Sequence, residues 1–339
     1  MRARFVVPAL LAAIMAAAPL LAFDRGEVLL ENRTQPAKQV PMDSFDLWQY
    51  SGGSYALLTA WALTEKPVPY TGAGHFLVPQ ANQIIFHNNQ TVSVWDGVIH
   101  RFTETVKGYT DIFHDTTELS EFAPMRNGDF LVAERWNDLT HGASLIEFSF
   151  KGTVRSYRFP DVIDSANQRA LGARHIELLA DNCTLLYTLG DDDANGNRVR
   201  RMNLCTGLPQ TDFATLPAGQ YAGSIRQLPG GNVLVADGTA VFQFSSEGSL
   251  LRTYQLPGVT SLALSVDGRT FWAAAVDHEQ ASLKHFDPAV VDGAAVSVGL
   301  GNPGSQSSVA PLEVSDLVVV DEWRASAISV NGRVRAARH

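Results

Sequence analysis

The chain reads Gly231-Asn232-Val233-Leu234-Val235-Ala236-Asp237, followed by Phe242-Gln243-Phe244-Ser245-Ser246-Glu247-Gly248. Residues 127–134 and 146–154 repeat this cadence as Asn127-Gly128-Asp129-Phe130-Leu131-Val132-Ala133-Glu134 and Ile146-Glu147-Phe148-Ser149-Phe150-Lys151-Gly152-Thr153-Val154. A tyrosine and a proline follow in both passages, at Tyr157, Pro160, Tyr254 and Pro257. A β-type unit that returns at such a period is the sequence signature of a radial array of small sheets.

Six passages share one pattern, in which a turn with Gly, Asn or Asp leads into an apolar strand, and a loop leads to a second strand. They are 82–86 with 92–97, 127–134 with 146–154, 181–187 with 201–207, 231–237 with 242–248, 267–272 with 283–287, and 317–321 with 328–332. The first strands are almost continuously apolar, which is typical of burial on both faces. In the second strands apolar and polar residues alternate, which indicates one buried and one more exposed face.

Further short runs flank these pairs, such as 251–254 and 261–264. Four strands in each unit predict an all-β fold, a β-propeller. The number of repeated strand pairs favours six four-stranded blades, with seven as the alternative. We assign residues 74–339 to the propeller. Residues 23–73 do not match the repeat, and we expect them to be an N-terminal extension or to supply the strand that closes the ring.

The first 22 residues are expected to be a cleaved export signal. Arg2 and Arg4 precede an apolar stretch at 5–21, and Ala22 stands before a polar segment at 23–25. The stretch contains two prolines and is shorter than the about 20 residues that span a bilayer, so cleavage is favoured over the alternative of an uncleaved anchor. We therefore expect a mature chain that is secreted or periplasmic and has no transmembrane segment.

The formal net charge is −9 at pH 7. An acidic chain is repelled by nucleic acid and by anionic lipid surfaces. Neither is expected as a partner. A ligand that is a small molecule or a protein is compatible with this charge, and the sequence does not identify it.

Two passages resemble the NHL and SMP-30-like group of six-bladed β-propellers, namely 229–237 and Ser265-Val266-Asp267-Gly268-Arg269. The resemblance extends over roughly residues 74–335. It rests on turn and strand residues and implies the fold, not an activity. SMP-30-type lactonases carry a Glu-Gly-Pro sequence near the first blade and an Asn-Gly pair at a central metal site. This chain has neither at a matching position.

Cys183 and Cys205 are the only cysteines, and they stand at the ends of two strand-like runs. Folding the hairpin between them about its centre puts the two residues opposite each other, at the separation that a disulfide requires. In an exported protein we therefore predict a disulfide between them, with two buried thiols as the alternative.

In a propeller, the loop between a blade's second and third strands opens on the same face as the link between blades. The acids that close one strand after another, Glu134, Asp237 and Asp321, are predicted to bond the backbone of turns. Residues found in one blade only are candidates for ligand binding: Arg135, Trp136, His141, His175, His278 and Glu279, with Arg174, Glu177, His114, Glu322 and Trp323 in similar loops or links. Such side chains can bind a polar ligand or support acid–base chemistry, and scattered surface residues are the alternative interpretation.

Residues 191–196 read Asp-Asp-Asp-Ala-Asn-Gly and match the opening of a calcium-binding loop. Oxygen ligands at Asp191, Asp193 and Asn195 alternate so that they can face one Ca²⁺ ion. The position of the closing acid is Met202, so the match is partial, and a hairpin turn centred on Asn-Gly is the competing interpretation.

The sequence contains no complete catalytic signature such as a nucleophile elbow, a phosphate-binding glycine loop or a His-Glu-x-x-His zinc motif. We therefore expect an exported propeller that acts as a ligand- or protein-binding module. A metal-assisted lactonase, hydrolase or lyase, with its site at the mouth of the channel, is the alternative.

Overall fold

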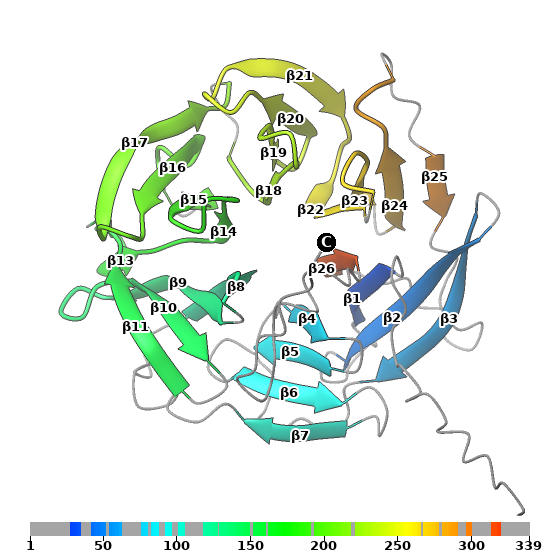
Figure 1. The fold of residues 1–339 in the computed structure, drawn as a ribbon, viewed down its shortest axis with the longest axis horizontal. Coiled ribbons are helices and arrows are strands. Elements are labelled where there is room, and N and C mark those ends of the chain that lie inside the picture. Colours follow the sequence, from blue (N-terminus) through cyan, green and yellow to red (C-terminus); the bar gives the residue numbers. More distant parts are fainter. Residues whose placement is uncertain are drawn as a thin grey trace, which may run out of the picture.

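The structure, a computed structural model, describes the chain over these residues: 28–34, 42–51, 54–62, 76–80, 83–87, 92–96, 101–105, 118–127, 129–149, 152–160, 162–190, 193–217, 221–265, 267–277, 280–290, 296–299 and 313–319. Its strands form six antiparallel sheets arranged around a common centre (Figure 1). The protein is an all-β propeller, as predicted. We name the sheets blades A to F in the order in which they follow one another around the ring.

The innermost strand of each blade is named first, and the others follow outward. Blade A contains β26 (Glu313–Val319), β1 (Val28–Thr34), β2 (Met42–Ser51) and β3 (Ser54–Ala62). Blade B contains β4 (Phe76–Gln80), β5 (Gln83–His87), β6 (Val92–Asp96) and β7 (Arg101–Thr105). Blade C contains β8 (Glu118–Pro124), β9 (Phe130–Asp138), β10 (Ser144–Ser149) and β11 (Gly152–Arg158), and a hairpin of β12 (Val162–Asp164) and β13 (Arg169–Leu171).

The remaining three blades have four strands each. Blade D contains β14 (His175–Leu178), β15 (Thr184–Thr188), β16 (Arg198–Asn203) and β17 (Leu208–Thr215). Blade E contains β18 (Ile225–Gln227), β19 (Val233–Ala236), β20 (Ala240–Phe244) and β21 (Leu250–Gln255). Blade F contains β22 (Val259–Leu264), β23 (Phe271–Asp277), β24 (Gln280–Phe286) and β25 (Val296–Gly299).

Five of the six predicted strand pairs are the second and third strands of blades B to F. The sixth differs. Residues 317–319 belong to β26, whose partner is β1 from the other end of the chain, with Val28 opposite Val319. Residues 328–332, which the sequence pattern pairs with 317–321, lie outside the described residues, as does Asp321. Within residues 23–73, β1 to β3 supply three strands of blade A.

The continuously apolar run of β19 is explained by its position between two neighbouring blades. Val233 and Val235 pack in the cluster shared with blade D, and Leu234 and Ala236 pack in the cluster shared with blade F. Successive side chains of a strand point to opposite faces of its sheet, so a strand covered on both faces must be apolar at every position. Each fully buried Val or Leu contributes about 1.5–3 kcal/mol relative to exposure.

The repeated tyrosine holds the outer strand of its blade to the next strand inward. Tyr157 donates a hydrogen bond to Glu147 in blade C, with 3.1 Å between the oxygens, and Tyr254 donates to Gln243 in blade E at 2.9 Å. Both phenols and both acceptors are buried. The acceptors are the polar residues of the alternating strands β10 and β20, which explains why a buried strand carries one polar side chain.

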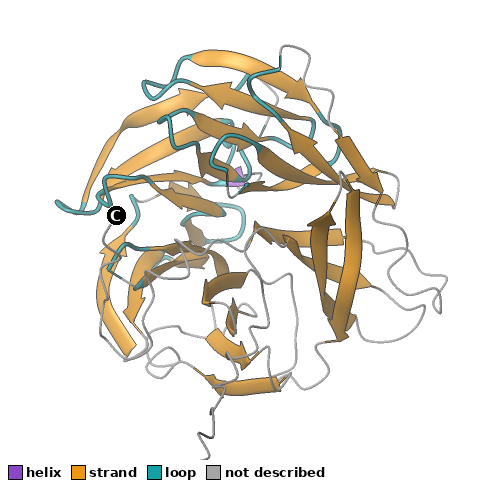
Figure 2. Ribbon diagram, turned by 45° about the vertical axis from the view of Figure 1, so that its right-hand side comes forward, coloured by secondary structure: helices purple, strands orange, loops and turns teal. Residues whose placement is uncertain are grey.

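The repeated glycine is required where blades D and E touch. Gly248 has a φ of 86° in the turn between β20 and β21. A Cβ atom at this position would collide with the backbone oxygen of Phe213 in blade D. A positive φ is strained for most other residues, and the close approach to the Phe213 oxygen leaves no room for a Cβ atom. Figure 2 shows the ring from another direction, with strands making up nearly all of its described secondary structure, and no helix among the described residues is long and apolar enough to cross a membrane.

Candidate functional site

Strand register places several of the predicted ligand-binding residues at one end of blades C and D. β8 begins at Glu118, opposite Trp136 near the end of β9, and β14 begins at His175, opposite Thr188 at the end of β15. The link into each inner strand and the loop after each second strand therefore open at the same end. We call this end the loop face. In blades C and D its described residues are 135–142, 162–175, 188–190 and 193–197.

The hairpin β12–β13 extends blade C at the loop face. β13 pairs with the last residues of β9, and Leu171 lies opposite Trp136. The guanidinium of Arg169 stacks over the ring of Trp136, 4.0 Å from its centroid. Trp136 is half-buried against the core shared by blades C and D, so the tryptophan forms the base of this part of the face and Arg169 covers it. Such cation–π contacts contribute about 0.5–1 kcal/mol at exposed sites.

His141 is held by Asp138 in the loop between β9 and β10. Its Nδ1 lies 2.7 Å from one carboxylate oxygen of Asp138. The other oxygen accepts hydrogen bonds from the backbone N–H groups of Thr140 and His141, each at 2.8 Å. The imidazole is exposed, and so is the neighbouring Leu139, at 41%. The loop therefore presents an oriented imidazole and an apolar side chain to solvent.

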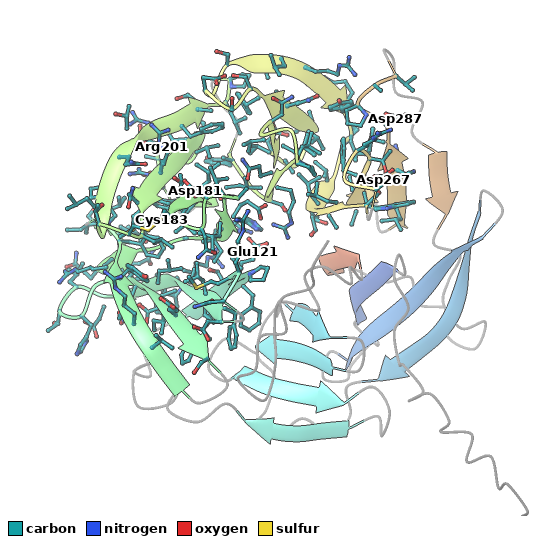
Figure 3. The ribbon with its side chains drawn as sticks, viewed as in Figure 1. Glu121, Asp181, Cys183, Arg201, Asp267 and Asp287 are labelled. Carbon is teal, nitrogen blue, oxygen red and sulfur yellow. A yellow bond between two sulfur atoms is a disulfide. The ribbon has the colours of Figure 1, made fainter. Side chains whose placement is uncertain are left out.

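Three consecutive inner strands bring together a cluster that sequence reasoning did not assemble. The central charged cluster consists of Glu121 on β8, His175 and Glu177 on β14, and Arg226 on β18. Glu121, Glu177 and Arg226 are buried and His175 is half-buried. Figure 3 shows Glu121 on the side of its blade that faces the centre of the ring.

Glu121 is the residue on which the contacts of the cluster converge. One of its oxygens accepts from the backbone N–H of Ile176 at 2.8 Å and lies 3.3 Å from Nδ1 of His175. The other accepts from Nη2 of Arg226 at 3.0 Å. Arg226 Nη1 donates to the carbonyl of Ile225 at 2.6 Å and lies 3.9 Å from Glu177. The two carboxylates thus face one guanidinium and one imidazole.

These carboxylates also connect neighbouring blades. Inner strands of different blades do not exchange a regular ladder of hydrogen bonds, so their backbone N–H groups need other partners. Glu121 supplies one for Ile176 in blade D, and Glu177 supplies one for Gln227 in blade E, at 3.0 Å. Ser224 does the same for Leu262 in blade F, at 3.2 Å. The cluster therefore has a structural role in blades C, D and E.

The acids predicted to be structural bond the backbone as expected. Glu134 is buried and accepts from the N–H of Ser144 at 2.6 Å and from the side-chain amide of Asn137 at 3.1 Å. Asp237 accepts from the N–H groups of Thr239 and Ala240, each at 2.7 Å. Both residues therefore bond nearby backbone, as the sequence predicts for repeated acids. Asp237 does so in the turn that follows β19, whereas Glu134 lies within β9 and bonds the first residue of β10.

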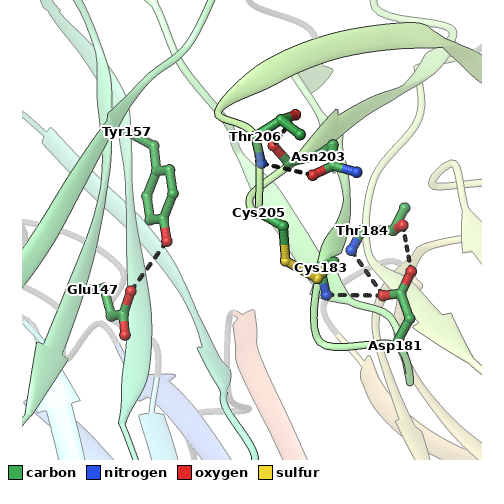
Figure 4. The surroundings of a disulfide bond; sticks show 8 residues. All are labelled: Glu147, Tyr157, Asp181, Cys183, Thr184, Asn203, Cys205 and Thr206. Carbon is green, nitrogen blue, oxygen red and sulfur yellow. Dashed lines mark hydrogen bonds between the residues drawn. A yellow bond between two sulfur atoms is a disulfide. The ribbon is translucent and has the colours of Figure 1, made fainter.

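The predicted disulfide joins Cys183 and Cys205, whose Cα atoms are 5.2 Å apart (Figure 4). The two residues flank the hairpin of β15 and β16, in which Thr184 lies opposite Asn203. The hairpin symmetry that predicted the bond is therefore present. Asp181 caps the same corner by accepting from the N–H groups of Cys183 and Thr184 at 2.9 and 2.8 Å.

In the predicted calcium loop, the guanidinium of Arg200 already contacts Asp193, one of the three predicted calcium ligands. Asp193 is buried, and one of its oxygens accepts from Nη2 of Arg200 at 2.7 Å. Its other oxygen accepts from the N–H of Asn195 at 3.1 Å. Arg200 lies opposite Tyr187, whose pKa burial raises to about 12, with the charge of Arg200 acting in the other direction. In this conformation the Asp193 carboxylate is occupied, and a calcium ion would have to displace the guanidinium.

Several predicted residues cannot be placed. Asp191 lies outside the described residues, as do the following candidates of the binding face and its links: His114, His278, Glu279, Glu322 and Trp323. Arg135 and Arg174 lie at the loop face and are half-buried. Among the residues that the structure does describe, no three His, Cys, Asp or Glu side chains gather closely enough to hold a metal ion.

No protein-family model and no curated protein sequence matches this chain. Solved structures match its fold. A protein of unknown function from Bacteroides caccae is 14% identical with a TM-score of 0.61, over 87% of this chain and 98% of that one. A calcium-binding protein, regucalcin from Agrobacterium tumefaciens, is 15% identical with a TM-score of 0.50, over 76% and 86% of the two chains.

A third similar structure is a catalytically inactive histidine variant of virginiamycin B lyase from Staphylococcus aureus with quinupristin. It is 13% identical with a TM-score of 0.51, over 80% of this chain and 84% of the lyase. Regucalcin and the lyase are both β-propellers, which agrees with the propeller part of the resemblance seen in the sequence. At such identities the similarity establishes the fold alone.

Proposed function

We propose that this protein is an exported β-propeller that binds a polar ligand, a small molecule or a region of another protein, at its loop face. The observation that carries the proposal is the β12–β13 hairpin, which enlarges the loop face of blade C and stacks Arg169 on Trp136. Beside it, Asp138 orients an exposed His141. Guanidinium, imidazole and aromatic groups held in fixed positions are the means by which proteins recognise polar ligands.

Export is part of the proposal and has two supports. Residues 1–22 have the pattern of a signal peptide. The Cys183–Cys205 disulfide agrees with it, because disulfides persist in oxidising compartments and are rare in the cytosol. Expression of the full chain in a bacterial host, followed by fractionation and mass determination, tests both. A mature protein that begins near residue 23 is expected, and full-length protein retained in the cytosol would contradict export.

The binding proposal is tested by thermal-shift measurements against a panel of organic acids, amino acids and oligosaccharides. A compound that raises the Tm of the parent should do so less in Arg169→Ala and His141→Ala. Arg201→Ala is the matched control, because Arg201 lies on β16 outside the loop face and donates to a backbone carbonyl of its own blade. Equal shifts in all four proteins would place binding elsewhere.

A metal-assisted lactonase, hydrolase or lyase is the second candidate. The central charged cluster supplies carboxylates and an imidazole for its acid–base chemistry, but no metal site within the described residues. The carboxylate of Glu121 lies 3.3 Å from Nδ1 of His175, and a carboxylate beside an imidazole can serve as an acid–base pair. Arg226 would stabilise negative charge that develops nearby. If the protein has this activity, turnover of lactone or ester substrates with added divalent metal ions should be lost in His175→Gln. Binding without turnover in the parent favours the first candidate.

The calcium site at 191–195 remains a prediction, and Arg200 provides a sharp test of it. Calcium should raise the Tm of the parent, and Asp193→Ala should lose that response. Because Arg200 occupies Asp193, Arg200→Gln should respond at lower calcium concentrations than the parent. An unchanged Tm in millimolar calcium for both the parent and Arg200→Gln would leave the loop as a hairpin turn.

A further inference from the structure

A serine and a histidine meet on blade F, outside the loop face. Ser265 follows β22 in the turn that leads to β23, and His285 lies on β24. The Oγ of Ser265 is 3.0 Å from Nε2 of His285. β22 begins at the end of blade F that corresponds to the loop face, so the turn at its other end opens on the opposite face. The pair is therefore separate from the site proposed above.

The backbone and a tryptophan hold the two groups in place. Trp272 lies opposite Ala263 on one neighbouring strand and opposite His285 on the other. The imidazole stacks on the indole with ring centroids 4.0 Å apart and planes 12° apart. The N–H of Ser265 donates to the carbonyl of Thr270 at 3.0 Å. Because Trp272 is 3% exposed, the ring that supports the imidazole is itself fixed by packing.

The protonation state of His285 suits a base. Burial lowers the pKa of His285, and the charges of Asp267 and Asp287 act in the opposite direction without reversing the shift. The lowered pKa favours the neutral ring. A neutral imidazole carries one proton, so when Nε2 accepts from the Ser265 hydroxyl, Nδ1 carries the proton.

We propose that Ser265 is an activated nucleophile that takes the acyl group of a small ester, with His285 as its base. The Oγ attacks the carbonyl carbon as its proton passes to Nε2 of His285. The ester C–O bond then breaks, and the proton passes from Nε2 to the departing alkoxide. The products are acyl-Ser265 and an alcohol, and no other reactant is required. Both groups are half-buried, which allows access to small esters.

Blade E provides a turn serine that lacks the imidazole. Ser245 is half-buried like Ser265, and its N–H donates to the carbonyl of Ser249. Its Oγ accepts from the backbone N–H groups of Glu247 and Ser249, both at 3.2 Å. A serine whose oxygen accepts from two amides, and whose side chain bonds the carboxylate of Glu247 where Ser265 has an imidazole, is a poor nucleophile because a carboxylate is the weaker base. Ser245 is therefore the matched control.

The experiment treats the mature protein with 4-nitrophenyl acetate, follows nitrophenolate release, and locates the acetyl group by peptide mass spectrometry. Acetyl-Ser265 is expected in the parent and in Ser245→Ala. It should be absent in Ser265→Ala. In His285→Gln, which retains a hydrogen-bonding partner for the serine but no base, the acylation rate should fall at least about tenfold, towards the 100- to 10,000-fold typical of a positioned base.

The pH dependence separates a base from a structural contact. Acylation of Ser265 should slow as the pH falls through the lowered pKa of His285, because the protonated ring cannot accept the hydroxyl proton. Circular dichroism and Tm confirm that each variant is folded. Equal labelling of Ser265 and Ser245, an unchanged rate in His285→Gln, or a rate that follows bulk hydroxide alone would each overturn the proposal.

Discussion

Blades C and E share one template and differ where they reach the loop face. Both have a buried second strand, an alternating third strand and a tyrosine that bonds the third strand. In blade E, β19 has four residues and ends in the short turn capped by Asp237. In blade C, β9 has nine residues and also pairs with β13. The shared residues build the sheet, and the additional residues of blade C build a surface.

The two blades also differ in how they connect to the next blade. Blade C uses the carboxylate of Glu121, which is 3% exposed and bonds both Ile176 and Arg226. Blade E uses the hydroxyl of Ser224, which accepts one hydrogen bond from Leu262. A buried charge is costly to leave unpaired, whereas a lost hydroxyl leaves only one amide without a partner. The hydrogen bond that joins a blade to the next one should therefore contribute much more to the free energy of unfolding in blade C than in blade E.

The largest predicted effect tests this difference. Glu121→Ala should lower the free energy of unfolding by about 3–5 kcal/mol, because it removes the nearer carboxylate of the buried Arg226 guanidinium, leaving only Glu177 at 3.9 Å, and the acceptor of the Ile176 N–H. Ser224→Ala should cost about 1 kcal/mol. Urea unfolding followed by tryptophan fluorescence measures both. Equal losses in the two variants would mean that the charge adds nothing to the junction of blades C and D.

The repeated acids Glu134, within β9, and Asp237, just after β19, give the next comparison. Glu134→Ala should cost about 2–3 kcal/mol, because a buried carboxylate with two donors is removed. Asp237→Ala should cost about 1 kcal/mol, because the turn of blade E is half-exposed and water can replace the lost acceptor. The corresponding amides, Glu134→Gln and Asp237→Asn, should recover part of each loss. A larger loss in blade E would reverse this ranking.

The tyrosines provide a smaller and closely matched test. Tyr157→Phe should cost about 1.5–2 kcal/mol because the acceptor, Glu147, is a buried carboxylate, and Tyr254→Phe should cost about 1 kcal/mol because its acceptor is the amide of Gln243. Equal costs for the two substitutions would show that the charge of the acceptor is unimportant.

The same tyrosines predict a loss of stability at alkaline pH. Burial raises the pKa of Tyr157, and the charge of Glu147 raises it further; burial likewise raises the pKa of Tyr254. Their contribution is present below the unfolded value of about 10 and is lost as the pH rises through the folded pKa. Unfolding measured between neutral and alkaline pH should show this decline, and it should be smaller in the two Phe variants.

The sequence predicted the parts of the fold that depend on local pattern. The apolar runs such as 233–236 identified strands buried between blades, and the spacing of Cys183 and Cys205 about a hairpin predicted their disulfide. In both cases the sequence signal lies within one strand or one hairpin. Because the same pattern recurs in several blades, the strand assignment in one repeat supported the assignment in the others.

The central charged cluster was not predicted because its contacts join residues far apart in the chain. Glu121 bonds Ile176 across 55 residues and Arg226 across 105. Its only local signal is a glutamate in the short inner strand of two successive blades, as at Glu121 and Glu177. The β12–β13 hairpin was missed because its strands have three residues each, too few to show an alternating pattern.

The smallest expected change in stability gives the sharpest comparison of the two blades. His141 and Thr239 both lie in the loop after the second strand, in blades C and E, and both are exposed. His141→Ala and Thr239→Ala should each change the free energy of unfolding by no more than about 0.5 kcal/mol, as expected for exposed positions. The contact of His141 Nδ1 with Asp138 does not alter this expectation, because exposed contacts of this kind contribute little.

The two variants should differ in ligand affinity, although their free energies of unfolding are expected to be similar. For the panel compound that raises the Tm of the parent most, His141→Ala should raise the Kd at least about tenfold, which corresponds to a loss of about 1.4 kcal/mol of binding free energy. Thr239→Ala should bind as the parent does, since blade E lacks the enlarged surface. Calorimetric titration of both variants measures the difference. If Thr239→Ala weakens binding as much as His141→Ala, the ligand spans the whole face, and the enlargement of blade C does not determine where it binds.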